Sequence, residues 1–302
     1  MQKHTGIWKG PLKKTWKWEN MTVLQELRMI KIATIAGSDA SGGAGLEADL
    51  KTFEEYGLYG MAAVTLVATM DPGNNWAHKV FPLDENAIRS QMDTIFEGVG
   101  VQAAKSGMLG TFYAVDLVGE FLDKFMIKNY ILDPVMVCKG AGEALNPELN
   151  AAVEKKLLPL AEVATPNLFE AEQLSGLREI TTIEQMKEAA RIIHGKGARY
   201  VFIKGGAKLK EAIAAGKAAD LFFDGTKFET FEEDLIRTVW THGAGCTTSA
   251  AIASGLARGL PVREAVLLAK KFITASLKAG FPLNKWVGPG SPSDWRKDRL
   301  FG

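Results

Sequence analysis

The chain has 302 residues, with 36 Lys and Arg against 35 Asp and Glu. This balance gives no global electrostatic reason to bind nucleic acid or an acidic membrane surface, and we expect neither partner. No apolar run approaches membrane-spanning length. Two cysteines, Cys138 and Cys246, are too few for a disulfide framework or a four-ligand zinc site. We expect a globular, cytoplasmic protein.

Residues 1–28 differ in composition from the rest of the chain. They carry six Lys or Arg residues against two Glu, together with Trp8, Trp16 and Trp18, and they show no secretory pattern. The segment is either an amphipathic membrane or partner helix or a dispensable extension. We favour the extension, because Met29 directly precedes the first predicted strand. Residues 29–302 are then expected to form a single domain.

From Met29 onward, apolar runs alternate with helical spacing. The predicted strands cover residues 30–36, 62–68, 103–108, 130–136, 163–167 and 200–204. The predicted helices cover residues 44–56, 86–96, 114–125, 244–258 and 262–279. Residues 221–224 and 227–231, joined by Asp-Gly, are typical of a hairpin. The alternation predicts an α/β fold whose mostly parallel central sheet is covered by helices on both faces.

A glycine-rich turn follows the first predicted strand. It reads Gly-Ser-Asp-Ala-Ser-Gly-Gly-Ala-Gly over residues 37–45 and leads into a helix that carries Asp49. It is neither G-x-G-x-x-G nor a Walker A sequence, since no Gly-Lys-Ser/Thr follows. Open α/β sheets bind ligands at the carboxyl ends of their strands, where this turn lies. The turn is therefore expected to face a ligand, whereas Asp49 can equally be a solvated helix charge.

Two carboxylates follow neighbouring strands in the middle of the chain. Asp133 ends one strand and precedes a loop with Cys138 and Lys139, and Asn167 and Glu170 follow the next strand. Two carboxylates at adjacent strand ends can hold a hydrated Mg²⁺. Each alone can equally cap a helix.

A lysine with two glycines follows a later strand. This segment is Lys204-Gly205-Gly206, and a lysine at the end of a strand can meet a phosphate as a point charge.

The most informative motif is Thr-His-Gly-Ala-Gly-Cys-Thr-Thr at residues 241–248, which opens a long predicted helix. Its glycines allow close backbone approach, and a helix N-terminus offers unpaired N–H groups and partial positive charge to an anion. A thiol at a helix N-terminus has a lowered pKa. We therefore expect Cys246 to accept the proton of a substrate hydroxyl. The alternative is a glycine N-cap followed by a packed cysteine.

These five motifs occur in the order and spacing of a known family. Over about residues 30–289 the chain resembles the hydroxymethylpyrimidine-phosphate kinases and the related bacterial pyridoxal kinases of the ribokinase superfamily. The resemblance implies a ribokinase-like three-layer fold with a small lid or flap. It also implies an ATP- and Mg²⁺-dependent kinase that acts on a small molecule and forms a homodimer.

The resemblance also implies a role for each matched residue. The anion hole and catalytic base match Gly243, Ala244, Gly245 and Cys246, where most ribokinase relatives place aspartate as the base. The ring substrate is lined by positions matching Gly37, Ala44, Asp49, Met70 and Cys138. The nucleotide-side positions are Lys139, Asn167, Lys204, Gly205 and Gly206, and the Mg²⁺-associated carboxylates are Asp133 and Glu170.

Two positions bear on the substrate. Met70 stands where the pyrimidine kinases typically have a glutamine, and methionine cannot supply the paired donor and acceptor of an amide. Cys138 stands in a lid-like loop where the pyrimidine branch more often has alanine. Both features resemble pyridoxal kinases of the Bacillus type, which implies phosphorylation of the 5′-hydroxymethyl group of pyridoxal, pyridoxine or pyridoxamine. Hydroxymethylpyrimidine or its phosphate, or dual activity, is the alternative.

Two other classes of protein fit the residues less well. A sugar or nucleoside binder without kinase activity needs neither a base nor metal carboxylates. An NAD-dependent oxidoreductase requires G-x-G-x-x-G after the first strand, which is absent here.

Deletion of residues 1–28 is expected to leave both the melting temperature and the kinase activity unchanged, because the composition shift at Met29 marks the start of the folded domain. Thermal unfolding and steady-state assays of the truncated chain test this. A large loss of either property would show that the tryptophans pack on the domain.

Cys138→Ala is expected to lower kcat/KM for pyridoxal much more than for pyridoxine. A lid thiol can add reversibly to the 4-aldehyde of pyridoxal as a hemithioacetal and so hold the hydroxymethyl group near Cys246, a positioning gain that the alcohol cannot obtain. The aldehyde absorbance of pyridoxal should also fall on mixing only with the protein that keeps Cys138. Equal losses on both substrates would point to a general lid defect instead.

Overall fold

The computed structural model describes residues 29–136 and 147–296. These residues build one nine-stranded sheet in the order β3-β2-β1-β4-β5-β6-β7-β8-β9. The strands are β1 (Lys31–Asp39), β2 (Tyr59–Asp71), β3 (Ala77–Pro82), β4 (Ala103–Ser106), β5 (Tyr130–Leu132), β6 (Val163–Ala164), β7 (Tyr200–Gly206), β8 (Lys217–Phe223) and β9 (Phe228–Asp234). Strands β2, β1, β4, β5, β6 and β7 are parallel, and β3, β8 and β9 are antiparallel to their neighbours.

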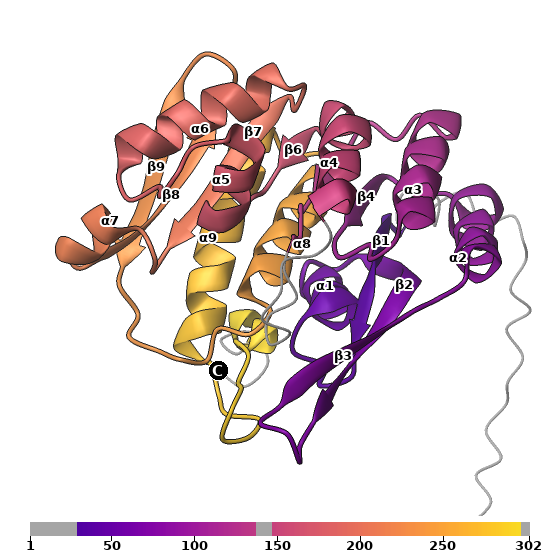
Figure 1. Cartoon of the computed structure of the whole chain (residues 1–302), viewed down its shortest axis with the longest axis horizontal. Coiled ribbons are helices and arrows are strands. Elements are labelled where there is room, and N and C mark those ends of the chain that lie inside the picture. The colour runs from indigo at the N-terminus through magenta and orange to yellow at the C-terminus, as the bar shows by residue number, and fades with distance from the viewer. Residues whose placement is uncertain (1–28, 137–146, 297–302) are drawn as a thin grey trace, which may run out of the picture.

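Helices cover both faces of this sheet (Figure 1). They are α1 (Gly45–Glu55), α2 (Glu85–Met92), α3 (Phe112–Lys124), α4 (Pro147–Lys156), α5 (Leu168–Ser175), α6 (Ile183–Gly195), α7 (Lys210–Ala214), α8 (Ala244–Ala257) and α9 (Val262–Lys278). Shorter helical turns are η3 (Asp93–Val99, π-type), η4 (Leu158–Leu160) and η5 (Pro292–Arg296). The predicted three-layer, mostly parallel α/β architecture is therefore confirmed.

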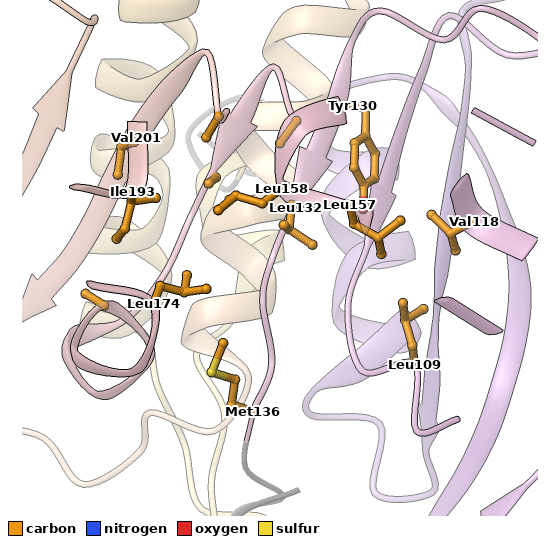
Figure 2. Packing of buried hydrophobic residues seen from close by; sticks show 14 of the residues in the cluster. Leu109, Val118, Tyr130, Leu132, Met136, Leu157, Leu158, Leu174, Ile193 and Val201 are labelled. Atoms are coloured by element: carbon orange, nitrogen blue, oxygen red, sulfur yellow. The ribbon is translucent and has the colours of Figure 1, made fainter. Parts of the chain in front are cut away.

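An apolar layer covers each face of the sheet, and successive residues of a strand contribute alternately to one layer and the other. Along β1, Ile32 packs with α1, α8 and α9, whereas Ala33 and Ile35 pack with the layer of α2 to α6. Figure 2 shows part of that second layer, from Val118 of α3 on one side to Ile193 of α6 on the other. Parallel strands buried on both faces explain the continuous apolar runs in the sequence.

The order in which the chain adds strands to the sheet changes direction at β1. From β1 the chain moves to β2 on one side and then returns to β4 on the other, so the loops after β1 and β4 leave the sheet in opposite directions. A crevice opens at such a switch point, beyond the carboxyl ends of the strands. The glycine-rich turn after β1 therefore begins at the place where an α/β sheet binds its ligands.

The sequence analysis did not predict β3, which forms a two-stranded flap with the last part of β2. Strand β2 runs to Asp71, three residues beyond the end of the predicted strand, and its last part pairs with β3 from Leu66↔Pro82 to Asp71↔Ala77. Strand β3 reads Ala-His-Lys-Val-Phe-Pro, with Val80 partly buried and Phe81 exposed, so it lacks a clear alternation of buried apolar and exposed polar residues. The tip of this hairpin reaches the loop before η5, where Trp76 and Trp286 stack with ring centroids 5.5 Å apart.

Several element bounds differ from the predictions. Strand β5 ends at Leu132 and not at residue 136: Asp133 still donates its N–H to the Ser106 carbonyl of β4, but Pro134 has no N–H with which to continue the ladder. The helix predicted over residues 86–96 ends at Met92 and continues as a π-turn to Val99. The hairpin of β8 and β9 forms as predicted, with longer strands and the Asp224 N–H donating to the Lys227 carbonyl. In the described part of the chain, no helix combines the length and apolar character that a membrane span requires.

Gly255→Val is expected to lower the free energy of unfolding by about 1–3 kcal/mol, the usual cost of overpacking. A Cβ at Gly255 would lie 2.7 Å from the Ala265 Cβ, because α8 and α9 touch there. The matched control is Gly195→Ala at the end of α6, where a Cβ meets nothing within 4 Å. Denaturant unfolding measures the difference in stability between the two variants. Equal stabilities would show that α8 and α9 can move apart at little energetic cost.

Candidate active site

Two glycine-rich turns pack directly against each other at the carboxyl edge of the sheet. Gly243 is the N-cap of α8 and has a left-handed φ of 73°. A Cβ on Gly243 would overlap the carbonyl oxygen of Gly43, and a Cβ on Gly43 would lie 2.5 Å from the His242 ring. Only glycine fits such close backbone approach. The motif at residues 241–248 therefore lies on the turn at residues 37–45.

A side-chain hydrogen bond between His242 and Asp39 joins these two turns. His242 Nε2 lies 2.6 Å from Asp39 Oδ2, and both side chains are largely buried. The other Asp39 contacts are the N–H groups of Ser41, at 2.8 Å, and Ala44, at 2.9 Å. Burial opposes ionisation, but the hydrogen bonds from His242 and Ser41 lower the pKa of Asp39 to about 2. The sequence analysis assigned no role to either residue of this pair.

The residues expected to line the ring substrate differ in their burial and in their contacts. Gly37 is buried against Leu66 of β2, and its carbonyl oxygen faces Gly45. Ala44 is partly exposed and is the N-cap of α1. Gly45 has a φ of 59° and donates its N–H to the Cys246 sulfur. The turn after β1 thus brings backbone groups to the thiol, in keeping with the expected ligand surface.

Cys246 lies in the first turn of α8 and is partly exposed. The expected lowering of its pKa is wrong, because burial raises the pKa of the thiol to about 11. Lys105 and the Gly45 N–H act in the opposite direction, whereas Asp133 and Asp49 add to the increase. Burial and two nearby carboxylates therefore outweigh the position at a helix N-terminus.

Asp133 and Lys204 form the charged centre of the site. Lys204 Nζ lies 2.6 Å from Asp133 Oδ1, and a Cβ on Gly245 would come within 3.4 Å of the same nitrogen. Burial lowers the pKa of Lys204, but Asp133 and Glu170 outweigh it and raise that pKa. The predicted phosphate-side lysine is therefore a cation, and it lies against the predicted anion hole of residues 243–246.

Asn167 and Glu170 form a reciprocal cap at the start of α5. The Asn167 side chain accepts the Glu170 N–H at 3.0 Å, and Glu170 Oε2 accepts the Asn167 N–H at 2.8 Å. The capping role that each residue alone allowed is thus present. Burial, with the charge of Asp133 in addition and Lys204 opposing, raises the pKa of Glu170 to about 7.

The carboxylates of Asp133 and Glu170 suit a divalent cation by their chemistry. They are buried oxygen donors that interact with each other, and Mg²⁺ is commonly bound by one or two carboxylates, with water and substrate phosphates completing its shell. Within residues 29–136 and 147–296, no group of three or more His, Cys, Asp or Glu side chains is placed to share a metal. The pair therefore fits a metal that takes its other ligands from phosphate and water.

The sequence analysis missed a fully buried lysine, Lys105 of β4. Its Nζ lies 2.8 Å from Asp49 Oδ2 and 4.0 Å from Asp133 Oδ2, and Thr34 also donates to Asp49 at 2.6 Å. Burial alone would lower the pKa of Lys105, but Asp49, Cys246 and Asp133 raise it. Asp49 is hence no solvated helix charge. A lysine within the apolar run Ala-Ala-Lys-Ser, at the end of a strand, was the available signal.

Met70 lies on the flap. It pairs directly with His78 across β2 and β3, and His78 interacts electrostatically with His242 and Asp39. Directly opposed residues of antiparallel strands point to the same face. The side chains of Met70 and His78 therefore lie on the same face of the flap.

The remaining predicted residues divide into two groups. Gly205 and Gly206 end β7 next to Lys204, and Gly206 has a left-handed φ of 49°. Cys138 and Lys139 lie outside the described residues.

The site as a whole can hold and neutralise a phosphoryl group. The N-terminus of α8, the Lys204 ammonium and a pair of buried carboxylates converge around Cys246. Helix N-termini and lysines stabilise phosphate oxygens, and a thiol next to them is a candidate proton acceptor.

Known proteins of similar sequence and fold are kinases of small molecules. The chain is 52% identical over 270 residues to the pyridoxine kinase of Bacillus subtilis, covering 89% of this chain and 98% of that protein. It is 37% identical over 270 residues to the hydroxymethylpyrimidine/phosphomethylpyrimidine kinase of Haemophilus influenzae, covering 89% and 98%. The structure of the Staphylococcus aureus pyridoxal kinase in complex with AMP-PCP and pyridoxal matches with a TM-score of 0.83 at 43% identity, covering 90% of this chain and 96% of that one.

The family model described as phosphomethylpyrimidine kinase matches residues 39–291, which include most of the turn at residues 37–45, Asp133, Lys204 and the start of α8. The chain therefore belongs to the phosphomethylpyrimidine kinase family, within the ribokinase-like fold.

Proposed function

We propose that this chain is an ATP-dependent kinase that phosphorylates the 5′-hydroxymethyl group of pyridoxal, pyridoxine and pyridoxamine. With pyridoxal the product is pyridoxal 5′-phosphate, so the reaction serves vitamin B6 salvage. The observation that carries this proposal is the position of the Lys204 ammonium against Gly245 at the start of α8, beside Cys246. A relative with 43% identity and the same fold binds AMP-PCP and pyridoxal together, which supports both the donor and the acceptor.

Phosphoryl transfer needs positioning and charge neutralisation more than covalent chemistry. In this proposal, the N–H groups at the start of α8 and the Lys204 ammonium stabilise the negative charge of the transferred group. The close packing of Gly43 on Gly243 fixes the direction in which those N–H groups point. The acceptor hydroxyl then lies between this anion hole and the turn after β1.

Mg²⁺ is the divalent cation that we propose for the reaction. Asp133 and Glu170 would hold it, directly or through water, and it would neutralise charge on the phosphates of ATP. Lys204 already pairs with Asp133 at 2.6 Å, so the same carboxylate orients the phosphate-side lysine.

Cys246 is proposed as the general base. A pKa of about 11 leaves the thiol protonated at neutral pH in the ligand-free chain. Proton acceptance therefore requires that bound ligands change the charges around the sulfur. Lys105 is the buried cation that favours the thiolate, and Asp133 and Asp49 are the carboxylates that oppose it.

The preference for the vitamin over the pyrimidine rests on the flap. Met70 cannot hydrogen-bond a pyrimidine edge as an amide can, and it lies on the flap directly opposite His78. The higher identity to a pyridoxine kinase than to a hydroxymethylpyrimidine kinase supports the same choice. Phosphorylation of hydroxymethylpyrimidine or its phosphate is the second candidate, because the family description names that activity. A homodimer in the cytoplasm is part of the same proposal.

Kinetics on three acceptors test the proposal. Measured with ATP and Mg²⁺, kcat/KM for pyridoxal and pyridoxine should exceed that for hydroxymethylpyrimidine, since specificity is the ratio of these constants. A higher value for the pyrimidine would assign the chain to thiamine biosynthesis instead.

Cys246→Ala is expected to reduce kcat by about 10²–10⁴, the usual contribution of positioned proton transfer. The affinity for ATP should stay nearly unchanged, because the backbone N–H groups of residues 243–245 remain. Cys246→Asp is the matched control, since a carboxylate can accept the proton at the same position, and it should retain more activity than the alanine variant. Single-turnover kinetics measure the effect; a near-normal rate for Cys246→Ala would remove the thiol from the mechanism.

A further inference from the structure

A buried ion pair lies behind the Lys204-Gly205-Gly206 segment and has no place in the reaction described above. Asp220 of β8 and Lys270 of α9 are 6% and 5% exposed, and their Oδ2 and Nζ atoms are 2.7 Å apart. Lys270 also donates to the Ala218 carbonyl at 3.3 Å. The second carboxylate oxygen, Asp220 Oδ1, accepts the N–H of Gly206 at 2.8 Å.

The pairing of β7 with β8 is irregular at this point. Ile203 pairs with Leu221 and Gly206 pairs with Ala219, so β7 has one more residue than β8 between these two pairs. Gly206 adopts a left-handed φ of 49°, and a Cβ on Gly205 would overlap the Ala219 carbonyl oxygen. Such a bulge interrupts the hydrogen bonds of the ladder and redirects the neighbouring side chains. The Asp220 carboxylate supplies the acceptor for the Gly206 N–H at the bulge.

The bulge begins at Lys204, whose ammonium faces Asp133 and Gly245. On the other side of the strand, the Lys204 N–H donates to the Pro166 carbonyl at 2.8 Å. The backbone of Lys204 is therefore held on one side by Pro166, in the segment after β6, and on the other by β8 through Gly206 and Asp220. A change in the bulge would alter the direction of the Lys204 side chain.

A purely structural reason for the pair is weak. Two charges removed from water cost more than their attraction commonly returns, and well-packed apolar residues would hold α9 on β8 equally well. An apolar residue at position 220 could not, however, accept the Gly206 N–H. The oxygen of Asp220 and the shape of the bulge are what such a replacement would lose.

From this geometry we infer that Asp220 and Lys270 are positioning residues for the nucleotide side of the site. Asp220 closes the bulge at Gly206 so that Lys204 is directed at the phosphates, and Lys270 compensates the buried carboxylate. The inference rests on the proposed function, because that proposal identifies the nucleotide as ATP. It assigns the pair to the ATP side only, since the ring side is formed by the turn at residues 37–45 and by the flap.

Two double variants separate the acceptor from the charge. Asp220→Leu with Lys270→Met removes both charges and the acceptor, and the chain should still fold because an apolar pair replaces a buried ion pair. Asp220→Asn with Lys270→Met also removes both charges but keeps a side-chain oxygen for Gly206. The matched control is Lys217→Met with Asp234→Leu, which removes the surface pair of the same hairpin.

The readouts are the Kd for ADP with Mg²⁺ by calorimetry, the KM for ATP and the KM for pyridoxal. The Leu/Met variant should raise the Kd for ADP and the KM for ATP about tenfold, the scale of one lost hydrogen bond to a buried group. Its KM for pyridoxal should stay within about twofold, because the ring side does not depend on Gly206. The Asn/Met variant and the surface control should bind ADP as the unmodified chain does.

Three results would overturn the inference. They are unchanged ADP binding in a folded Leu/Met variant, equal increases in both KM values, and an Asn/Met variant that binds ADP as weakly as the Leu/Met variant. ADP binding does not depend on the identity of the acceptor. An unmodified chain that binds ADP but phosphorylates no B6 vitamer would therefore contradict the proposed function and leave this test intact.

Discussion

The candidate site depends on a backbone contact between two glycine-rich turns from opposite ends of the domain. Gly43 and Gly243 approach so closely that neither has room for a Cβ, and His242 binds Asp39 across 203 residues of sequence. This contact places the start of α8 over the end of β1. The helix N-terminus, the thiol of Cys246 and the turn after β1 then share one position. A side chain at either glycine would separate them.

Below this contact, buried charges connect the ring side of the site with the phosphate side. Lys105 pairs with Asp49 under the first turn and lies 4.0 Å from Asp133, which in turn pairs with Lys204. Interactions between charges are strong where water is excluded. A ligand that changes the charge at Asp133 therefore also changes the electrostatic environment of Lys105 and Cys246. Burial raises the pKa of the Cys246 thiol, and Asp133 and Asp49 in this set of charges add to the increase.

Secondary-structure elements that depend on neighbouring residues alone were predicted correctly from the sequence. Apolar runs gave the strands of the parallel sheet, and Asp-Gly gave the β8–β9 hairpin. Elements with mixed composition were not: β3 has no clear alternation, so the flap strand was missed although the resemblance implied a flap. The pKa of Cys246 was predicted in the wrong direction because a helix N-terminus is visible in a sequence, whereas burial and neighbouring carboxylates are not.

The sequence motifs were sufficient to predict the fold class and the family, and they supplied the candidate residues of the site. Glycine spacing, strand-end carboxylates and the Gly-Ala-Gly-Cys motif are local features, and their physical meaning does not depend on distant residues. Which of these residues meet, and which charges surround them, became visible in the folded chain alone. The pairs His242–Asp39, Lys105–Asp49 and Lys270–Asp220 join residues 203, 56 and 50 positions apart. Such pairs depend on how the layers pack, because a buried charge is stable only beside a partner that packing brings to it.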